Sequence, residues 1–229
     1  MTKPNHESCY YQGCSQRGQT KEHIPPKSFF PKDQRKQLLT VKSCDLHNTA
    51  KSSDDIYVLA HICMNASPSN KSRDVFMQSV APQLGYNGDV LRKTLVKDAV
   101  LQHSGAVAYK VDIARFDRFF AALSYGIVYK ACGGSLPRGY RTGHVYHNFK
   151  DVSESPEEGA IKKALLAFYS GEPMAFMNFG RVNALNTTVY SVKIFGLPGF
   201  KSSITIVHNF FGIFRVTSML TKGIALSQK

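Results

Sequence analysis

The stretch "CYYQGCSQRGQTKEHIPP" (residues 9–26) decides how the first part of this chain folds. It carries two cysteines four residues apart, and the segment "CDLH" (residues 44–47) supplies a second cysteine with a histidine. The first 52 residues hold few aliphatic side chains, so a core of their own is too small to stabilise them. Three thiolates and one imidazole can make a tetrahedral zinc site, whose binding energy is then folding energy. The expected ligands of this structural Zn²⁺ are Cys9, Cys14, Cys44 and His47.

The bulk composition narrows the class of protein. A chain of 229 residues with 43% hydrophobic residues can bury a core and form one large or two small domains. An odd number of cysteines, five in all, after a beginning without an apolar leader argues against a disulfide framework. No apolar run reaches the length of a membrane span. We therefore expect a cytoplasmic protein that does not enter a membrane.

Hydrophobic periodicity predicts the remaining elements. Phe119 and Leu123 belong to an apolar stripe at helical spacing, and Ser155 with Glu158 forms a capping box at a helix start. Apolar residues on both faces of the later strands indicate a covered sheet. We expect an α+β protein, with a zinc-stapled module at residues 1–66 and a larger α+β domain at 67–229 that contains a mostly antiparallel sheet. The expected elements are a strand at 38–41, helices at 45–64, 71–84, 89–102, 113–131 and 155–170, turns at 133–143, a short strand at 105–111, and strands from 188 onward.

Two further groups of residues accompany the zinc pattern. Glu22-His23-Ile24-Pro25 follows the first ligand pair, and Cys44-x2-His47-Asn48-x2-Lys51 contains the second. In combination they resemble the HNH endonuclease family in its zinc-stapled form, over about residues 9–60. The resemblance implies a ββα-metal module, in which a β-hairpin and a helix hold one divalent ion. It also implies a standalone nuclease of bacterial or phage type, often found in anti-phage defence.

The resemblance assigns roles to single residues. His23 would be the general base, since a neutral imidazole can accept a proton near pH 7. Glu22 and Asn48 would bind the divalent ion, and such oxygen ligands suit Mg²⁺ or Mn²⁺. Asp55 has two open interpretations: a further ligand of the ion, or a solvated carboxylate near a helix start. The sequence departs from the family pattern where Glu22 replaces the more common Asp, and Gln37 is the nearest substitute for the missing middle asparagine.

The charge balance points to a polyanionic partner. The net charge is +13, and lysine or arginine set against phosphates releases counterions. An anionic membrane surface or an incidental surface excess would fit the same charge. The predicted function is metal-dependent hydrolysis of DNA phosphodiester bonds, with protein partners from a defence or mobile-element system. The alternative is a non-catalytic, zinc-dependent nucleic-acid-binding regulator. The candidate phosphate contacts are Lys27, Lys32, Arg35, Lys36 and Lys51.

A second group of metal-type residues lies later in the chain. His144 and His147 follow Cys132, but no fourth ligand stands at a sensible spacing. A structural role therefore fits these histidines better than a second metal site. Cys63 lies on the inner face of a predicted helix, which favours a small buried apolar residue.

Overall fold

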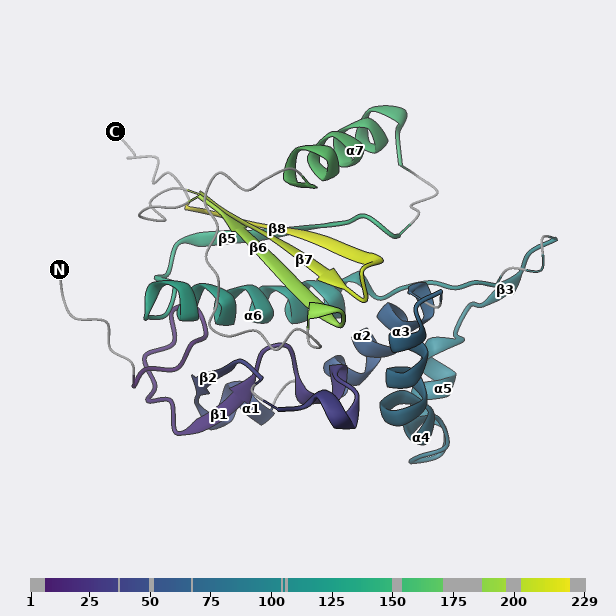
Figure 1. Cartoon of the computed structure of the whole chain (residues 1–229), viewed down its shortest axis with the longest axis horizontal. Coiled ribbons are helices and arrows are strands. Elements are labelled where there is room, and N and C mark those ends of the chain that lie inside the picture. The colour runs from purple at the N-terminus through teal and green to yellow at the C-terminus, as the bar shows by residue number, and fades with distance from the viewer. Residues whose placement is uncertain are drawn as a thin grey trace.

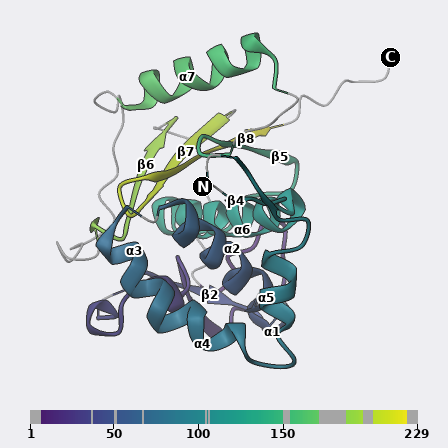
Figure 2. The ribbon, with the colours of Figure 1, turned by 90° about the vertical axis from the view of Figure 1, so that its right-hand side faces the viewer.

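A small antiparallel sheet lies in the middle of the fold, with helices on both of its faces. The computed structural model describes residues 7–36, 38–49, 52–66, 68–103, 105, 107–149, 154–170, 187–196 and 203–222. The sheet lies between α6 (Ile113–Cys132) on one side and α7 (Pro156–Ser170) on the other. The N-terminal hairpin lies on the far side of α6 from the sheet (Figures 1 and 2). The expected α+β class with antiparallel sheets is confirmed.

The N-terminal part is a hairpin followed by two helices. β1 (Thr20–His23) pairs antiparallel with β2 (Thr40–Ser43), so that Glu22 faces Val41 across the ladder. The 3₁₀ turns η1 (Lys27–Phe29) and η2 (Lys32–Gln34) occupy the connection. The helix expected over 45–64 is described as α1 (Asp45–Thr49) and α2 (Ser52–Asn65), and residues 50 and 51 lie outside the described residues.

A group of short elements follows α2. The helix expected over 71–84 forms as α3 (Asn70–Val75), a π turn η3 (Phe76–Val80) and α4 (Ala81–Leu84). The prediction of a helix over 89–102 is wrong at its C-terminal end, because α5 (Val90–Leu95) stops at Leu95. Asp98 then takes a left-handed conformation with φ 60°, which a helix does not accommodate. The chain then enters the short hairpin of β3 (Val100–Leu101) and β4 (Val107–Ala108), where the expected short strand is confirmed in part.

The remaining strands form one antiparallel sheet in the order β5-β8-β7-β6. β6 (Tyr190–Phe195), β7 (Ser203–Phe210) and β8 (Phe214–Lys222) lie in the region expected to form strands. The prediction of turns over 133–143 is wrong for its last four residues, because β5 (Tyr140–Tyr146) begins at Tyr140. The glycines and the proline that precede this strand end at Gly139. The capping box of α7 is confirmed, because Ser155 N donates to Glu158 Oε2 at 3.0 Å and Glu158 N to Ser155 Oγ at 3.2 Å.

Buried histidines join α6 to the sheet. His208 is fully buried, and its ring nitrogens lie 3.2 Å from Ser124 Oγ on α6 and 2.9 Å from the Tyr190 hydroxyl. His144 lies 2.8 Å from Ser218 Oγ, so it too has a hydrogen-bonding role within the sheet. Burial lowers the pKa of both His208 and His144, which keeps the rings neutral.

The histidines considered for a second metal site are thus accounted for by the fold. His147 Nε2 lies 2.8 Å from Thr217 Oγ1, as His144 does from Ser218. These contacts are consistent with a structural role for both histidines, and Cys132 is exposed at the end of α6. Cys63 is buried on α2, as expected.

A continuous hydrophobic core connects the hairpin, α6 and the sheet. Phe29 from the hairpin connection stacks on Phe119 of α6 at 5.2 Å and lies 5.6 Å from Phe210 of the sheet, measured between ring centroids. The expected apolar stripe of α6 is buried, as predicted. The proposed boundary after residue 66 stays a prediction, although one core spans both of its sides.

Gly126 sets how closely α6 approaches the hairpin. A Cβ atom at this position would lie 2.8 Å from Ile24 Cδ1 and 2.9 Å from Ile24 Cγ2, closer than van der Waals contact allows. Ile24 follows His23 directly and is almost fully buried. The absence of a side chain at Gly126 therefore fixes the distance between α6 and the end of β1.

We predict that Gly126→Val destabilises the protein by about 1–3 kcal/mol, because extra side-chain volume overpacks this contact. The measurement is the free energy of unfolding from denaturant titration. Lys130→Val is the matched control, since it places the same side chain at an exposed position of the same helix. Equal losses in both variants would show that β-branching in a helix, and not the contact with Ile24, causes the effect.

Candidate metal and active site

The four predicted zinc ligands converge at the base of the hairpin. The ligand atoms of Cys9, Cys14, Cys44 and His47 all lie within 4.8 Å of one another. Cys44 directly follows β2, and His47 lies on α1, so the hairpin and the first helix deliver one ligand pair together. Among the described residues, this is the single group of at least three such side chains close enough to hold one ion.

The distances in this cluster fit a tetrahedral zinc ion. Usual zinc–ligand bond lengths imply edges of about 3.8 Å between two thiolates and about 3.5 Å between a thiolate and an imidazole nitrogen. Cys14 Sγ lies 4.0 Å from Cys44 Sγ, and His47 Nδ1 lies 3.5 Å from Cys9 Sγ and 3.1 Å from Cys44 Sγ. Burial raises the pKa of the Cys9 thiol to about 11, so a bound cation is needed to hold this thiolate near pH 7. The donor set therefore fits a structural Zn²⁺.

Neighbouring residues brace the cluster. The ring of Tyr11 stacks on the imidazole of His47 at 4.0 Å, which holds the orientation of that ligand. Gly13 adopts φ 65° between the first two cysteines, and its amide donates to Leu136 O at 3.2 Å. Arg138 Nε donates to Gly13 O at 3.2 Å. The loop with the first ligand pair is thus attached to the segment after α6, far along the chain.

The other end of the hairpin forms a small pocket. Glu22 and His23 are the last two residues of β1, and Asp55 lies in the first turn of α2. Apolar residues of α6 form the opposite wall. The residues that line the pocket are Glu22, His23, Ile24, Pro26, Asp55, Phe119, Ala122 and Leu123.

The two carboxylates of the pocket carry an electrostatic cost. Burial is the main cause that raises the pKa of Glu22 to about 8, the charge of Asp55 adds to it, and a hydrogen bond with Ser43 acts in the opposite direction. The Tyr10 hydroxyl donates to Glu22 Oε1 at 3.2 Å and fixes one oxygen. Two carboxylates whose charges oppose each other, with oxygen donors facing one pocket, form a set that suits a hard divalent cation. Glu22 and Asp55 could therefore hold such an ion.

His23 has the features of a base in this pocket. Its Nδ1 is buried and has no hydrogen-bond partner among the described residues. Burial lowers the pKa of His23, and the charge of Lys27 lowers it further. The imidazole is therefore neutral near pH 7, and a nitrogen at this site is able to accept a proton.

The remaining predicted site residues are more dispersed. Asn48 is exposed on α1 and is not one of the residues that line the pocket, so its role as a ligand stays a prediction. Lys27, Lys32 and Lys36 are exposed around the hairpin connection. Arg35 serves the fold itself, since its Nε donates to Phe30 O at 2.9 Å. Lys51 and Gln37 lie outside the described residues.

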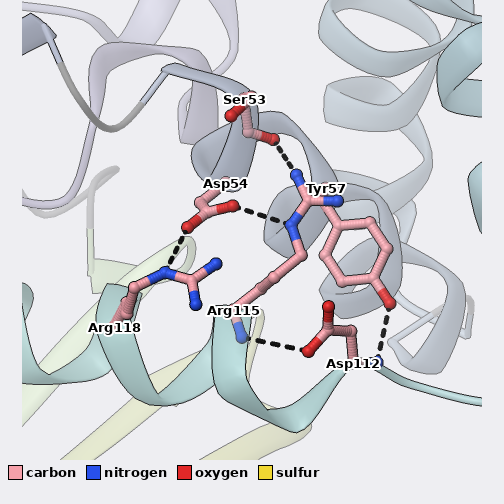
Figure 3. A network of polar contacts seen from close by, with 6 residues as sticks. All are labelled: Ser53, Asp54, Tyr57, Asp112, Arg115 and Arg118. Atoms are coloured by element: carbon pink, nitrogen blue, oxygen red, sulfur yellow. Dashed lines mark hydrogen bonds and ion pairs between the residues drawn. The ribbon is translucent and has the colours of Figure 1, made fainter.

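The sequence did not indicate the α6 wall of the pocket, and it left Arg115 and Arg118 open between a DNA-contacting face and a solvated helix surface. Phe119 and Leu123 of this wall belong to the apolar stripe of α6, and Ala122 lies between them on the same helix. Asp54, the neighbour of Asp55, binds Arg115 and Arg118 of α6 at 2.7 and 2.9 Å (Figure 3). No local signal in the sequence pairs α2 with a helix about sixty residues later.

The zinc assignment predicts that Cys44→Ser loses the metal and much of its stability. Structural zinc contributes about 10–16 kcal/mol in isolated zinc-finger peptides, so its loss outweighs ordinary marginal stability. Elemental analysis should find one zinc per chain in the wild type and none in Cys44→Ser. Thermal unfolding should show a sharply lower melting temperature for Cys44→Ser. Cys132→Ser is the matched control, because Cys132 is a free cysteine outside the cluster. A stable Cys44→Ser variant that retains its zinc would contradict this ligand set.

Comparison with known proteins leaves this site to be interpreted from its own geometry. No family model matches the chain. Neither the curated proteins nor the solved structures contain a match. Within the described part of the chain, no helix has both the length and the apolar composition to cross a membrane.

Proposed function

We propose that the chain is a metal-dependent endonuclease that hydrolyses DNA phosphodiester bonds. The observation that carries the proposal is the convergence of a neutral histidine, His23, with the carboxylates of Glu22 and Asp55 in one pocket beside the Cys3His cluster. Glu22 and His23 are groups that the resemblance to HNH endonucleases requires at the end of the hairpin, whereas Asn48, the other ligand that it implies, does not line the pocket. The net charge of +13 supports a nucleic acid as the substrate.

The chain's own residues account for the proton transfer. His23 accepts a proton from a water molecule, and the resulting hydroxide attacks phosphorus while the bond to the leaving oxygen breaks. The leaving oxygen then takes a proton from solvent. A divalent ion, when bound, would neutralise the charge that develops on this oxygen. In this proposal Glu22 and Asp55 hold the ion, because both already line the pocket with His23.

The zinc cluster positions this chemistry without taking part in it. Cys44 follows Ser43, which pairs with Thr20 at the start of β1, whereas His23 stands at the far end of the same ladder. The ion of the cluster thus stabilises the strand pairing that holds Glu22 and His23 in register. All four of its ligands are supplied by the protein, which is typical of a structural and not a catalytic zinc site.

We predict that His23→Ala lowers the rate of plasmid nicking or cutting by about 10²- to 10⁴-fold in Mg²⁺ or Mn²⁺, because the general base is lost. The wild-type rate should fall with decreasing pH only below the usual histidine range near 6.5, since the pKa of His23 is lowered and the base must be neutral. His103→Ala is the control, since His103 is exposed and lies outside the pocket.

Two results would refute the catalytic assignment: a wild-type protein that leaves plasmid intact in both metals, or a His23→Ala variant that cuts as fast as the wild type. If the intact plasmid is nevertheless bound, and bound equally by His23→Ala, the protein is a zinc-dependent nucleic-acid-binding regulator instead.

The pocket also predicts how metal affinity depends on pH. The pKa of Glu22 is about 8 without a cation, so metal binding must release its proton. The apparent affinity for Mn²⁺ should therefore rise by nearly tenfold per pH unit up to about pH 8. Asp55→Asn should weaken Mn²⁺ binding by at least tenfold, whereas Asp45→Asn, at an exposed position of α1, should not. Titration calorimetry on the zinc-loaded protein measures both effects. A pH-independent affinity, or equal affinities in the two variants, would remove these carboxylates from the metal site.

A further inference from the structure

Two arginines of α6 share one carboxylate of α2 beside the pocket. Asp54 accepts from Arg115 Nε at 2.7 Å and from Arg118 Nε at 2.9 Å (Figure 3). Asp112 adds a second carboxylate to this network, and its Oδ1 accepts from the Arg115 amide. Asp54 is mostly buried, with 16% of its side chain exposed, so both arginines are held by a fixed group.

Arg115 is used within the fold. Its Nη2 donates to Ser53 O at 2.6 Å, and its guanidinium lies 4.0 Å above the centre of the Tyr57 ring. Only 18% of its side chain is exposed. These contacts leave Arg115 little capacity for an external ligand, and they attach the first turn of α2 to α6.

Arg118, in contrast to Arg115, is largely exposed to solvent. Its side chain is 60% exposed, and only its Nε is bound to Asp54. No described residue accepts a hydrogen bond from its two Nη atoms, which in Figure 3 lie on the side of the guanidinium that faces Arg115. A guanidinium fixed at Nε presents its other donors in a planar fork with little conformational freedom left to lose. Such a fork matches the oxygens of a phosphate group.

The position of Arg118 relates it to the pocket. Phe119, the next residue, lines the pocket, and so does Ala122, which lies one helical turn further on the same face of α6 as Arg118. Its partner Asp54 is adjacent to Asp55, another lining residue. Arg118 is therefore adjacent to lining residues on α6, and its partner Asp54 is adjacent to one on α2, although Arg118 does not itself line the pocket.

We propose that Arg118 binds a backbone phosphate of the DNA strand that enters the pocket, and that Asp54 orients it for this contact. This inference rests on the proposed function, since it takes DNA as the ligand of this face. A backbone contact of this kind positions the strand and carries no sequence information.

The test is DNA binding as a function of salt. A short DNA duplex is titrated with the zinc-loaded protein at several salt concentrations, without added Mg²⁺ or Mn²⁺, so that the strands stay intact. Loss of one phosphate contact should lower the slope of log K against log salt by about 0.9. Arg118→Ala is expected to show this decrease and a weaker affinity, and Arg118→Lys, which keeps the charge, is expected to keep the slope.

Arg92→Ala is the matched control. Arg92 has the same 60% side-chain exposure and is also paired with an aspartate, Asp89, but it lies on α5 and outside the pocket lining. Its removal should leave the slope unchanged. The melting temperature of each variant checks that the fold is intact, and Arg118→Gln, which removes the charge but keeps a long side chain, serves as the readout if Arg118→Ala does not fold. In that case a slope that falls by about 0.9 in Arg118→Gln supports the phosphate contact, and an unchanged slope overturns it.

The outcomes separate this inference from the nuclease proposal. If the wild-type protein binds DNA but does not cut it, the nuclease proposal is wrong. The phosphate contact of Arg118 is still tested in that case, by the slope of log K against log salt in Arg118→Ala. Equal slopes in Arg118→Ala and the wild type overturn the phosphate contact, as does an equal decrease in Arg92→Ala. A wild-type protein that binds no DNA overturns it as well.

Discussion

The packing of α6 against the end of the hairpin is the contact on which the rest of the structure depends. Gly126 lets Ile24 approach the helix backbone, and Phe29 stacks on Phe119 from the same side. Every residue of α6 from Phe119 to Tyr129 except Ala121 is buried, since the hairpin covers one side of the helix and the sheet covers the other. A helix enclosed in this way cannot shift towards one neighbour without losing contact with the other. The pocket between β1, α2 and α6 therefore has a wall of fixed position.

The cysteine-histidine cluster stabilises the hairpin from the opposite end. A two-stranded ribbon of four residue pairs is marginal on its own, and here the cluster closes it where β1 begins and β2 ends. The loop of the first ligand pair is in turn attached to the chain after α6, through Gly13 and Arg138. The cluster and α6 thus restrain the same hairpin at its two ends. The residues with the chemistry, Glu22 and His23, lie at the end next to α6, where side chains from a distant part of the chain can shape the pocket.

This division explains which features could be predicted from the sequence. The cluster, the hairpin and the capping box at Ser155 are encoded by residues a few positions apart, or by two such groups whose chemistry requires them to meet. The pocket wall depends on contacts between residues far apart, for which the sequence contains no local signal. Phe119 has the same spacing whether it fills a core or lines a pocket. The open question about Asp55 was of the same kind, since its role depends on the angle between α2 and β1.

The distribution of charge around the pocket is consistent with a site for both a cation and a polyanion. Glu22 and Asp55 raise each other's electrostatic energy, and an arginine inside the pocket would relieve this cost and compete with a divalent ion. Asp54 prevents that, because it binds both nearby arginines at the adjacent position of α2. In the proposed site, the carboxylates of the pocket are thus left for a cation, while Arg118 and Lys27 are not among the residues that line it. Asp54 would in this way separate the two kinds of charge that the proposed reaction needs.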